Sequence, residues 1–216
     1  MWKFLRIAGW TAVVLAVLIG VLRLTAIRWW QLPGNDPYLD ASVEPTLHGG
    51  DWIVLWRATT PKFGDLVLCP EPKSNRPTIG RIAGESNDHL KLTGSALAIN
   101  NAPVEVEGKC DQFHARDPVS SSDVVQSCSF EVLNGRTHPR GNQIQTDQAP
   151  IGDKPPDPEF DVPSGQVFLL SDNRALPYDS RDYGTVDRGS CVETVVFRLV
   201  SKDGFFDVAN RLSLIR

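Results

Sequence analysis

The sequence has few of the residues that hold metals or redox centres, and those it has lie far apart. Its four histidines show no ligand spacing, and its four cysteines include no Cys-x-x-Cys pair. This scatter argues against a zinc site and a thioredoxin-like site, so we expect no bound metal. A glycine-rich nucleotide fingerprint is also absent, and we expect no cofactor. Beyond residue 30 the chain lacks runs rich in Lys and Arg, which argues against a nucleic-acid partner.

The first thirty residues contain no acidic side chain and are mostly apolar. Every residue from 7 to 22 except Thr11 is apolar or glycine, and the stretch extends through Ile27 if Arg23 reaches the interface. A helix needs about 20 such residues to cross a bilayer. Residues 24–30 make a poor signal-peptide cleavage site. We therefore expect residues 1–30 to form a retained membrane anchor with a short cytoplasmic head.

The distribution of charge predicts where the two parts lie. Lys3 and Arg6 precede the apolar run, which slightly favours an N-terminus in the cytoplasm. The whole chain has 26 acidic and 22 basic residues, and the first thirty carry no acid, so residues 31–216 are acidic. We expect a single-pass protein of the inner membrane, in contact with lipid, whose main domain lies on the exported side.

After residue 30 the pattern is typical of β-structure. Short apolar runs alternate with turn residues, and no helical period of useful length follows. The sequence therefore predicts a mainly β domain of coiled antiparallel sheets over residues 31–216. Residues 134–164 are dense in Gly, Pro, Asn and Asp, so we expect a long loop there, within a loop-rich insertion over about 100–164. The runs expected as strands are 52–56, 66–69, 90–92, 96–99, 104–106, 130–133, 167–170 and 192–200.

The cysteines form two pairs of different character. Cys110 and Cys128 bracket a polar stretch, and we expect a disulfide that closes it as a surface loop. Cys69 and Cys191 lie in apolar, strand-like runs. For these two, a disulfide and a pair of buried free thiols are both open.

Four segments, read in order, resemble the type I signal peptidase family, the membrane-anchored serine-lysine peptidases that remove signal peptides. The segments read SVEPTL followed by Gly50 and Asp51, then PKFGDLV, then IGRIAG, and finally VPSG leading to SDNR and DSRDYG; they begin at residues 42, 61, 79, 162, 171 and 179. Order and spacing both match over nearly the whole chain. The resemblance implies a monomer that cleaves signal peptides from exported pre-proteins.

The same resemblance implies a role for individual residues. Ser42 matches the nucleophile, and Asp40 lies in the region that stabilises the oxyanion, on a segment we expect to be extended. The supporting polar network is expected at Asp172, Asn173, Arg174, Asp179, Ser180 and Arg181. The substrate groove is expected at Tyr38, Leu39, Ala41, Val43, Pro77, Thr78 and Ile79.

Two positions depart from the family pattern. Gly80 occupies the position of the general-base lysine, and Pro177 replaces the serine that orients that lysine. A serine hydroxyl needs a neighbouring group to accept its proton, and glycine has none to offer. Two functions therefore stay open. The first is a signal peptidase with a recruited base, for which the candidates are Asp40, His48, Lys73, His89 and Lys91. The second is a catalytically silent relative that binds extended peptides or assists the assembly of exported proteins.

Overall fold

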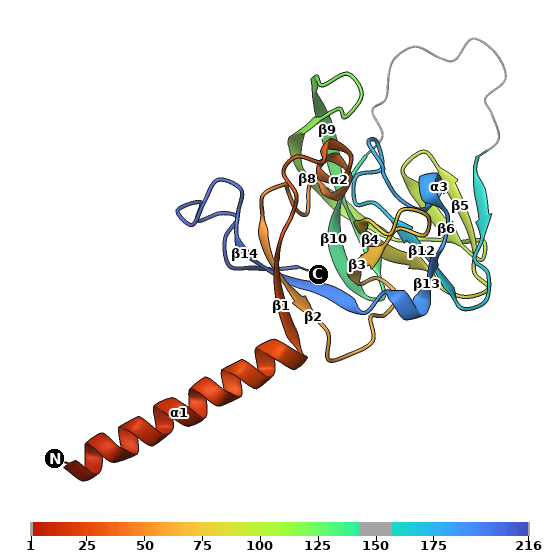
Figure 1. Cartoon of the computed structure of the whole chain (residues 1–216). Helices are drawn as coiled ribbons and strands as arrows, with labels where there is room; N and C mark the ends of the chain where they lie inside the picture. The colour runs from red at the N-terminus through yellow and green to blue at the C-terminus, as the bar shows by residue number, and fades with distance from the viewer. Residues whose placement is uncertain (1, 143–156, 216) are drawn as a thin grey trace.

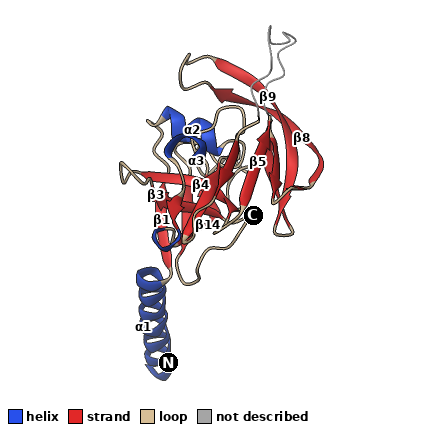
Figure 2. Cartoon of the chain, turned by 90° about the vertical axis from the view of Figure 1, so that its right-hand side faces the viewer, coloured by secondary structure: helices blue, strands red, loops and turns tan. Residues whose placement is uncertain are grey.

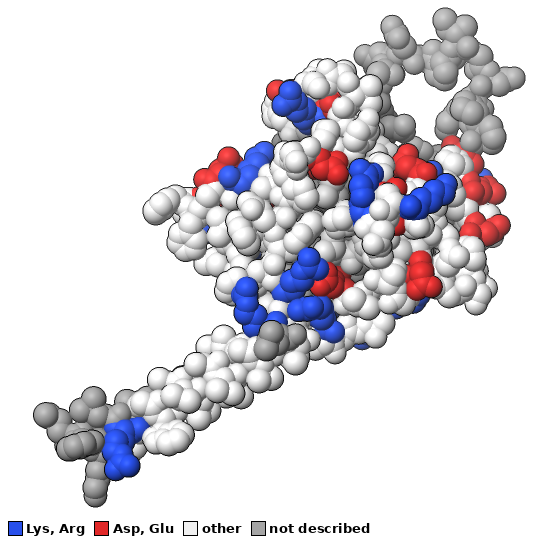
Figure 3. Space-filling model, viewed as in Figure 1, with Lys and Arg blue, Asp and Glu red and all other residues white. Residues whose placement is uncertain are grey.

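A long N-terminal helix projects from a β-rich body in the computed structural model, which describes residues 2–142 and 157–215 (Figure 1). This helix, α1 (Trp2–Thr25), exposes large apolar side chains such as Ile7, Trp10 and Val17. Its middle carries no charged side chain on the face seen in Figure 3. Among the described residues, no helix is long and apolar enough to cross a membrane.

The main sheet brings the two ends of the body together. All its strand pairs are antiparallel, as expected from the sequence. In spatial order it contains β1 (Ile27–Gln31), β2 (Trp52–Trp56), β14 (Glu193–Val200), β3 (Leu66–Pro70), β4 (Pro77–Gly84), β12 (Gln166–Leu170) and β13 (Val186–Asp187), with β15 (Ser213–Leu214) paired to β14.

Two smaller sheets complete the body. One contains β10 (Arg136–Gly141), β9 (Asp123–Leu133) and β8 (Val106–Arg116), and the other contains β11 (Glu159–Asp161), β5 (His89–Thr93), β6 (Ala96–Ile99) and β7 (Ala102–Pro103). Figure 2 shows β8 and β9 as a long curved hairpin at the edge of the body. The long loop expected over residues 134–164 contains two of the described strands, β10 and β11. The buried side chains of β10 are polar, so no apolar alternation marks that strand. Residues 143–156 of that expected loop lie outside the described residues.

Short helices interrupt the β-structure after residue 30, where the sequence predicts none. They are α2 (Pro37–Val43), α3 (Ser180–Tyr183) and the 3₁₀ turn η1 (Arg188–Ser190). Each is too short to show a helical period. Side-chain caps define them instead, because Asp36, Asp179 and Asp187 each accept hydrogen bonds from backbone N–H groups in the first turn.

Two apolar clusters lie around β4, and they fix the directions of its side chains. Ile79 packs in a cluster with Leu39 and Val43 of α2. Ile82 packs in a second cluster with Leu169. Because alternate strand residues point to opposite faces, position 80 shares the face of Ile82. A side chain at residue 80 would therefore start on the face away from the apolar contacts of α2.

Both pairs of cysteines are disulfides. Cys110 and Cys128 join β8 to β9, with their Cα atoms 4.9 Å apart. The stretch between them therefore includes paired strands as well as a turn. Cys69 and Cys191 join β3 to the segment just before β14, two residues from its start, with a Cα separation of 4.7 Å. The alternative left open by the sequence, two free thiols at Cys69 and Cys191, does not occur in this structure.

Candidate active site

Ser42 lies in the last turn of α2. The helix begins where Asp36 Oδ1 accepts hydrogen bonds from the amides of Tyr38 (3.2 Å) and Leu39 (3.1 Å), and Pro37 suits the first helical position. The Ser42 side chain is fully buried, and its Oγ donates a 2.9 Å hydrogen bond to Leu39 O. In this conformation the hydroxyl proton is directed at a backbone carbonyl of its own helix.

The expectation that Asp40 and Ser42 lie on an extended segment is wrong, because both belong to α2. The amide of Asp40 donates to Asp36 O at 3.0 Å, and its Oδ1 accepts a 2.5 Å hydrogen bond from the amide of Gly49. The N–H group of Asp40 is thus used within the helix. Its carboxylate contacts the turn that follows α2, whereas on an extended strand it would share a face with Ser42.

Gly80 is closely covered on the face where a side chain would begin. A Cβ atom on Gly80 would lie 2.9 Å from Leu169 Cβ and 3.6 Å from the backbone of Leu170. Every residue except glycine has a Cβ atom, so shortening Leu169 would not relieve this contact. A lysine at this position would need β4 and β12 to move apart.

Asp172 and Arg81 form a buried ion pair beneath α2. Arg81 donates through Nε (2.9 Å) and Nη2 (2.8 Å) to the two carboxylate oxygens, and Thr46 Oγ1 donates to Asp172 at 2.5 Å. Burial raises the pKa of Asp172, but the Arg81 charge and these hydrogen bonds outweigh it and hold the pKa below its usual value. The carboxylate is therefore ionised and fixed in position.

Asn173 connects this network to Ser42. Its backbone N–H donates to Ser42 O at 3.1 Å, and its side-chain Nδ2 donates to Ala41 O at 2.9 Å. The last carbonyl groups of a helix have no acceptor role inside it, so these bonds cap the carboxyl end of α2. The structure thus brings Asn173 and Asp172 together with the nucleophile position.

Asp179 organises the turn at the end of β12. Its carboxylate accepts from Ser171 N (2.8 Å) and, at both oxygens, from the side chain of Arg181 (2.9 and 2.7 Å). Ser180 Oγ accepts a 2.9 Å hydrogen bond from Leu169 N. These residues fix the backbone that covers Gly80.

Three buried polar residues from the β9–β10 hairpin complete the network, and none of them was predicted from the sequence. Glu131 is fully buried and accepts hydrogen bonds from Arg140 Nη1 (2.9 Å) and from Arg174 Nη2. His138 Nε2 lies 3.4 Å from Glu131 Oε2 and 3.8 Å from Asp172 Oδ1. The sequence signal for these residues is the polar side chains at alternate positions of β10, His138 and Arg140. Such a pattern is easily mistaken for the solvent-exposed face of an edge strand.

A carboxyl group and an imidazole group follow Ser42 in the next turn. Glu44 is 5% exposed, and its Oε1 lies 3.8 Å from His48 Nε2. Burial and the neighbouring Asp40 charge raise the pKa of Glu44 to about 8. Burial and the charge of Lys202 lower the pKa of His48. Both groups are therefore neutral near pH 7.

The other candidate bases have other surroundings. Lys91 Nζ bonds to Glu159 at 2.8 Å, and His89 Nδ1 lies 2.8 Å from Asp161, both across the β5–β11 pair. Lys73 is exposed in the turn between β3 and β4. None of these contacts joins them to Ser42.

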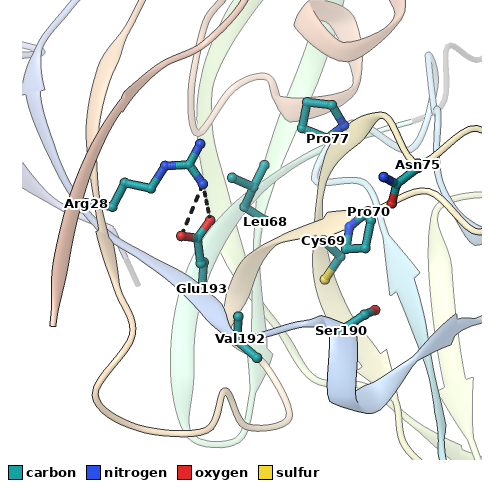
Figure 4. Close-up of a pocket in the computed structure, with 9 residues that line it drawn as sticks. All are labelled: Arg28, Leu68, Cys69, Pro70, Asn75, Pro77, Ser190, Val192 and Glu193. Carbon is teal, nitrogen blue, oxygen red and sulfur yellow. Dashed lines mark hydrogen bonds and ion pairs between the residues drawn. The ribbon is translucent and has the colours of Figure 1, made fainter. Parts of the chain in front are cut away.

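The residues expected in the substrate groove are divided between the surface and the core. Tyr38 and Pro77 are exposed, whereas the others, Leu39, Ala41, Val43, Thr78 and Ile79, are buried. Pro77 lines an open pocket of about 340 Å³ together with Arg28, Leu68, Cys69, Pro70, Asn75, Ser190, Val192 and Glu193. Figure 4 shows Arg28 and Glu193 paired on one side of this pocket, with Pro77 and Asn75 on the other.

Comparison with known proteins agrees with the motif order. A family model described as "Signal peptidase, peptidase S26" matches residues 5–200. "Signal peptidase I U" of Bacillus subtilis is 26% identical over 184 residues, which cover 83% of this chain and 79% of the relative. "Signal peptidase I" of Streptococcus pneumoniae serotype 4 is 24% identical over 185 residues, covering 85% and 88%. The likeness spans the segments that carry Ser42, Gly80 and Asp172.

Proposed function

Because the chain belongs to the signal peptidase S26 family, we propose that it recognises the signal peptides of exported pre-proteins at the Ser42 site, with at most weak peptidase activity. The observation that carries this proposal is the contact at Gly80. The position of the base has no side chain, and Leu169 Cβ occupies the space where one would begin. The full burial of Ser42 and its hydrogen bond to Leu39 O agree with weak peptidase activity.

The proposed location is a membrane, with residues 1–30 as anchor, a cytoplasmic N-terminus and the body on the exported side. Exposed apolar side chains along α1 and its uncharged middle support this proposal (Figure 3). At the end of the helix, the Arg23 guanidinium lies 4.0 Å from the ring centre of Trp29, a pair suited to the headgroup level. Two disulfides also favour an oxidising compartment.

A functioning peptidase is the second candidate, and the pair Glu44 and His48 favours it. Both groups follow Ser42 by a few residues, and both are neutral near pH 7. A neutral imidazole can accept the proton of a serine hydroxyl. For this to occur, the Ser42 hydroxyl would have to leave Leu39 O and turn toward His48.

One experiment separates the two candidates. The full chain, in detergent micelles, is given a pre-protein with its signal peptide, and binding and cleavage are measured for wild type and Ser42→Ala. We expect wild type and Ser42→Ala to bind the pre-protein equally well. Their cleavage rates should differ by less than about tenfold, because a serine without a base lacks the roughly 10²–10⁴-fold that base assistance supplies. The same pre-protein without its signal peptide is the control and should not bind. A wild-type rate about 100-fold above that of Ser42→Ala would identify a recruited base, which His48→Gln would then remove.

A further inference from the structure

The hairpin of β9 and β10 contacts the candidate active site, since His138 Nε2 lies 3.8 Å from Asp172 Oδ1. Glu131 on β9 is fully buried, and two arginines neutralise it, Arg140 from its own hairpin and Arg174 from the segment after β12. A buried carboxylate that loses such a partner is strongly destabilised, so the pair is a firm link between the hairpin and that segment.

Backbone contacts reinforce the link. The amide of Gly141 donates to Asp172 O at 2.9 Å, and the amide of Arg174 donates to Gly141 O at 3.0 Å. A Cβ atom on Gly141 would lie 2.8 Å from the Phe113 ring and 3.2 Å from Asn173 Oδ1. Only glycine allows the hairpin to approach Asn173 this closely.

Asn173 in turn holds the carboxyl end of α2 through Ala41 O and Ser42 O. The hairpin, Glu131, Arg174, Asn173 and Ser42 therefore form one continuous series of contacts. Each is a hydrogen bond or an ion pair between described residues, apart from the peptide bond that joins Asn173 to Arg174.

We infer that Glu131 is a positioning residue for the Ser42 site: its carboxylate holds Arg174, and thereby keeps Asn173 against the end of α2. The inference rests on the proposed function only for the meaning of the site, because the position of Asn173 can be measured without a substrate. Glu131 is not a catalytic residue, since it touches neither Ser42 nor the expected groove.

The test is amide hydrogen exchange on the full chain in micelles. Glu131→Gln keeps the shape of the side chain but removes the charge that Arg174 needs. We expect exchange at the Asn173 amide, which donates to Ser42 O, to rise by about tenfold or more relative to the Ile53 amide in β2. Arg140→Gln is the matched control. It removes the other partner of Glu131 and leaves Arg174 paired, so it should lower stability without this local change.

Equal exchange at Asn173 in wild type and Glu131→Gln, or the same rise in Arg140→Gln, would overturn the inference. If Glu131→Gln does not fold, Glu131→Asp serves instead, because it keeps the buried charge and draws it back from Arg174. A smaller, local rise at Asn173 is then expected, and no rise contradicts the inference. Signal-peptide binding is measured in parallel. If wild type does not bind but Asn173 responds as expected, the proposed function fails while the positioning role stands.

Discussion

Two neighbouring regions of this molecule differ sharply in the partners of their polar groups. Around Asp172, each carboxylate has an arginine partner: Arg81 for Asp172, Arg174 for Glu131, and Arg181 for Asp179. At Ser42, the hydroxyl bonds to a carbonyl of its own helix, and position 80 has no side chain. The difference supports the proposal that the network around Asp172 stays in place although position 80 carries no base, because the network also stabilises the fold.

The variant with the largest expected effect on this comparison is Asp172→Asn. It leaves the buried Arg81 charge without its partner, and we expect a loss of about 3–5 kcal/mol in the free energy of unfolding, measured with urea. Glu159→Gln, in the exposed pair with Lys91, is the control and should cost far less, because solvent screens that pair. Equal losses in the two variants would mean that the network does not stabilise the fold.

Gly80→Ala tests the other region. The added Cβ atom would meet Leu169 Cβ at 2.9 Å, so we expect a loss of about 1–3 kcal/mol, seen as a lower Tm. Gly34→Ala is the control, because a Cβ atom there makes ordinary contacts of 3.7 Å. A stable Gly80→Ala would show that the strands part easily. The combination of Gly80→Lys with Pro177→Ser should then restore cleavage, against our expectation.

Glu44 gives a pH test close to Ser42. Its pKa is raised to about 8 in the folded state, so its contribution to stability is fully present below the unfolded value of 4.5 and is lost as pH rises through 8. Between pH 4.5 and 9, the free energy of unfolding of Glu44→Gln should therefore rise relative to that of wild type by about 1 kcal/mol or more. Tm values at the two pH values follow this change. A Glu44→Gln variant that tracks wild type at both pH values would place the carboxyl in water.

The smallest expected effect concerns His138. Burial and the charge of Arg81 lower its folded pKa, so its contribution to stability is present above 6.5 and is lost as pH falls toward the folded value. The effect is small because Glu131 and Asp172 partly offset the cost of the imidazolium charge. His138→Gln should flatten the dependence of Tm on pH below 6.5. An unchanged slope in His138→Gln would contradict this prediction.

The sequence predicted the mainly β body and the family, because strand patterns and short motifs are local in the chain. It did not predict α2, whose seven residues depend on a cap at Asp36 and on packing against Ile79. Nor did it predict Glu131 and His138. These side chains are buried only because partners distant in sequence neutralise them, and such pairing leaves no periodic signal.

The helical conformation of residues 37–43 also contributes to the electric field at Ser42. The carboxyl end of a helix carries partial negative charge, since its last carbonyl groups point outward along the axis. An alkoxide on Ser42, or an oxyanion formed beside it, would meet a repulsive potential there, whereas nucleophiles near helix amino ends are favoured. The hydrogen bonds from Asn173 to Ala41 O and Ser42 O reduce that potential without reversing its sign. Adding a base alone would therefore leave the transition state poorly stabilised until the last turn of α2 unwinds.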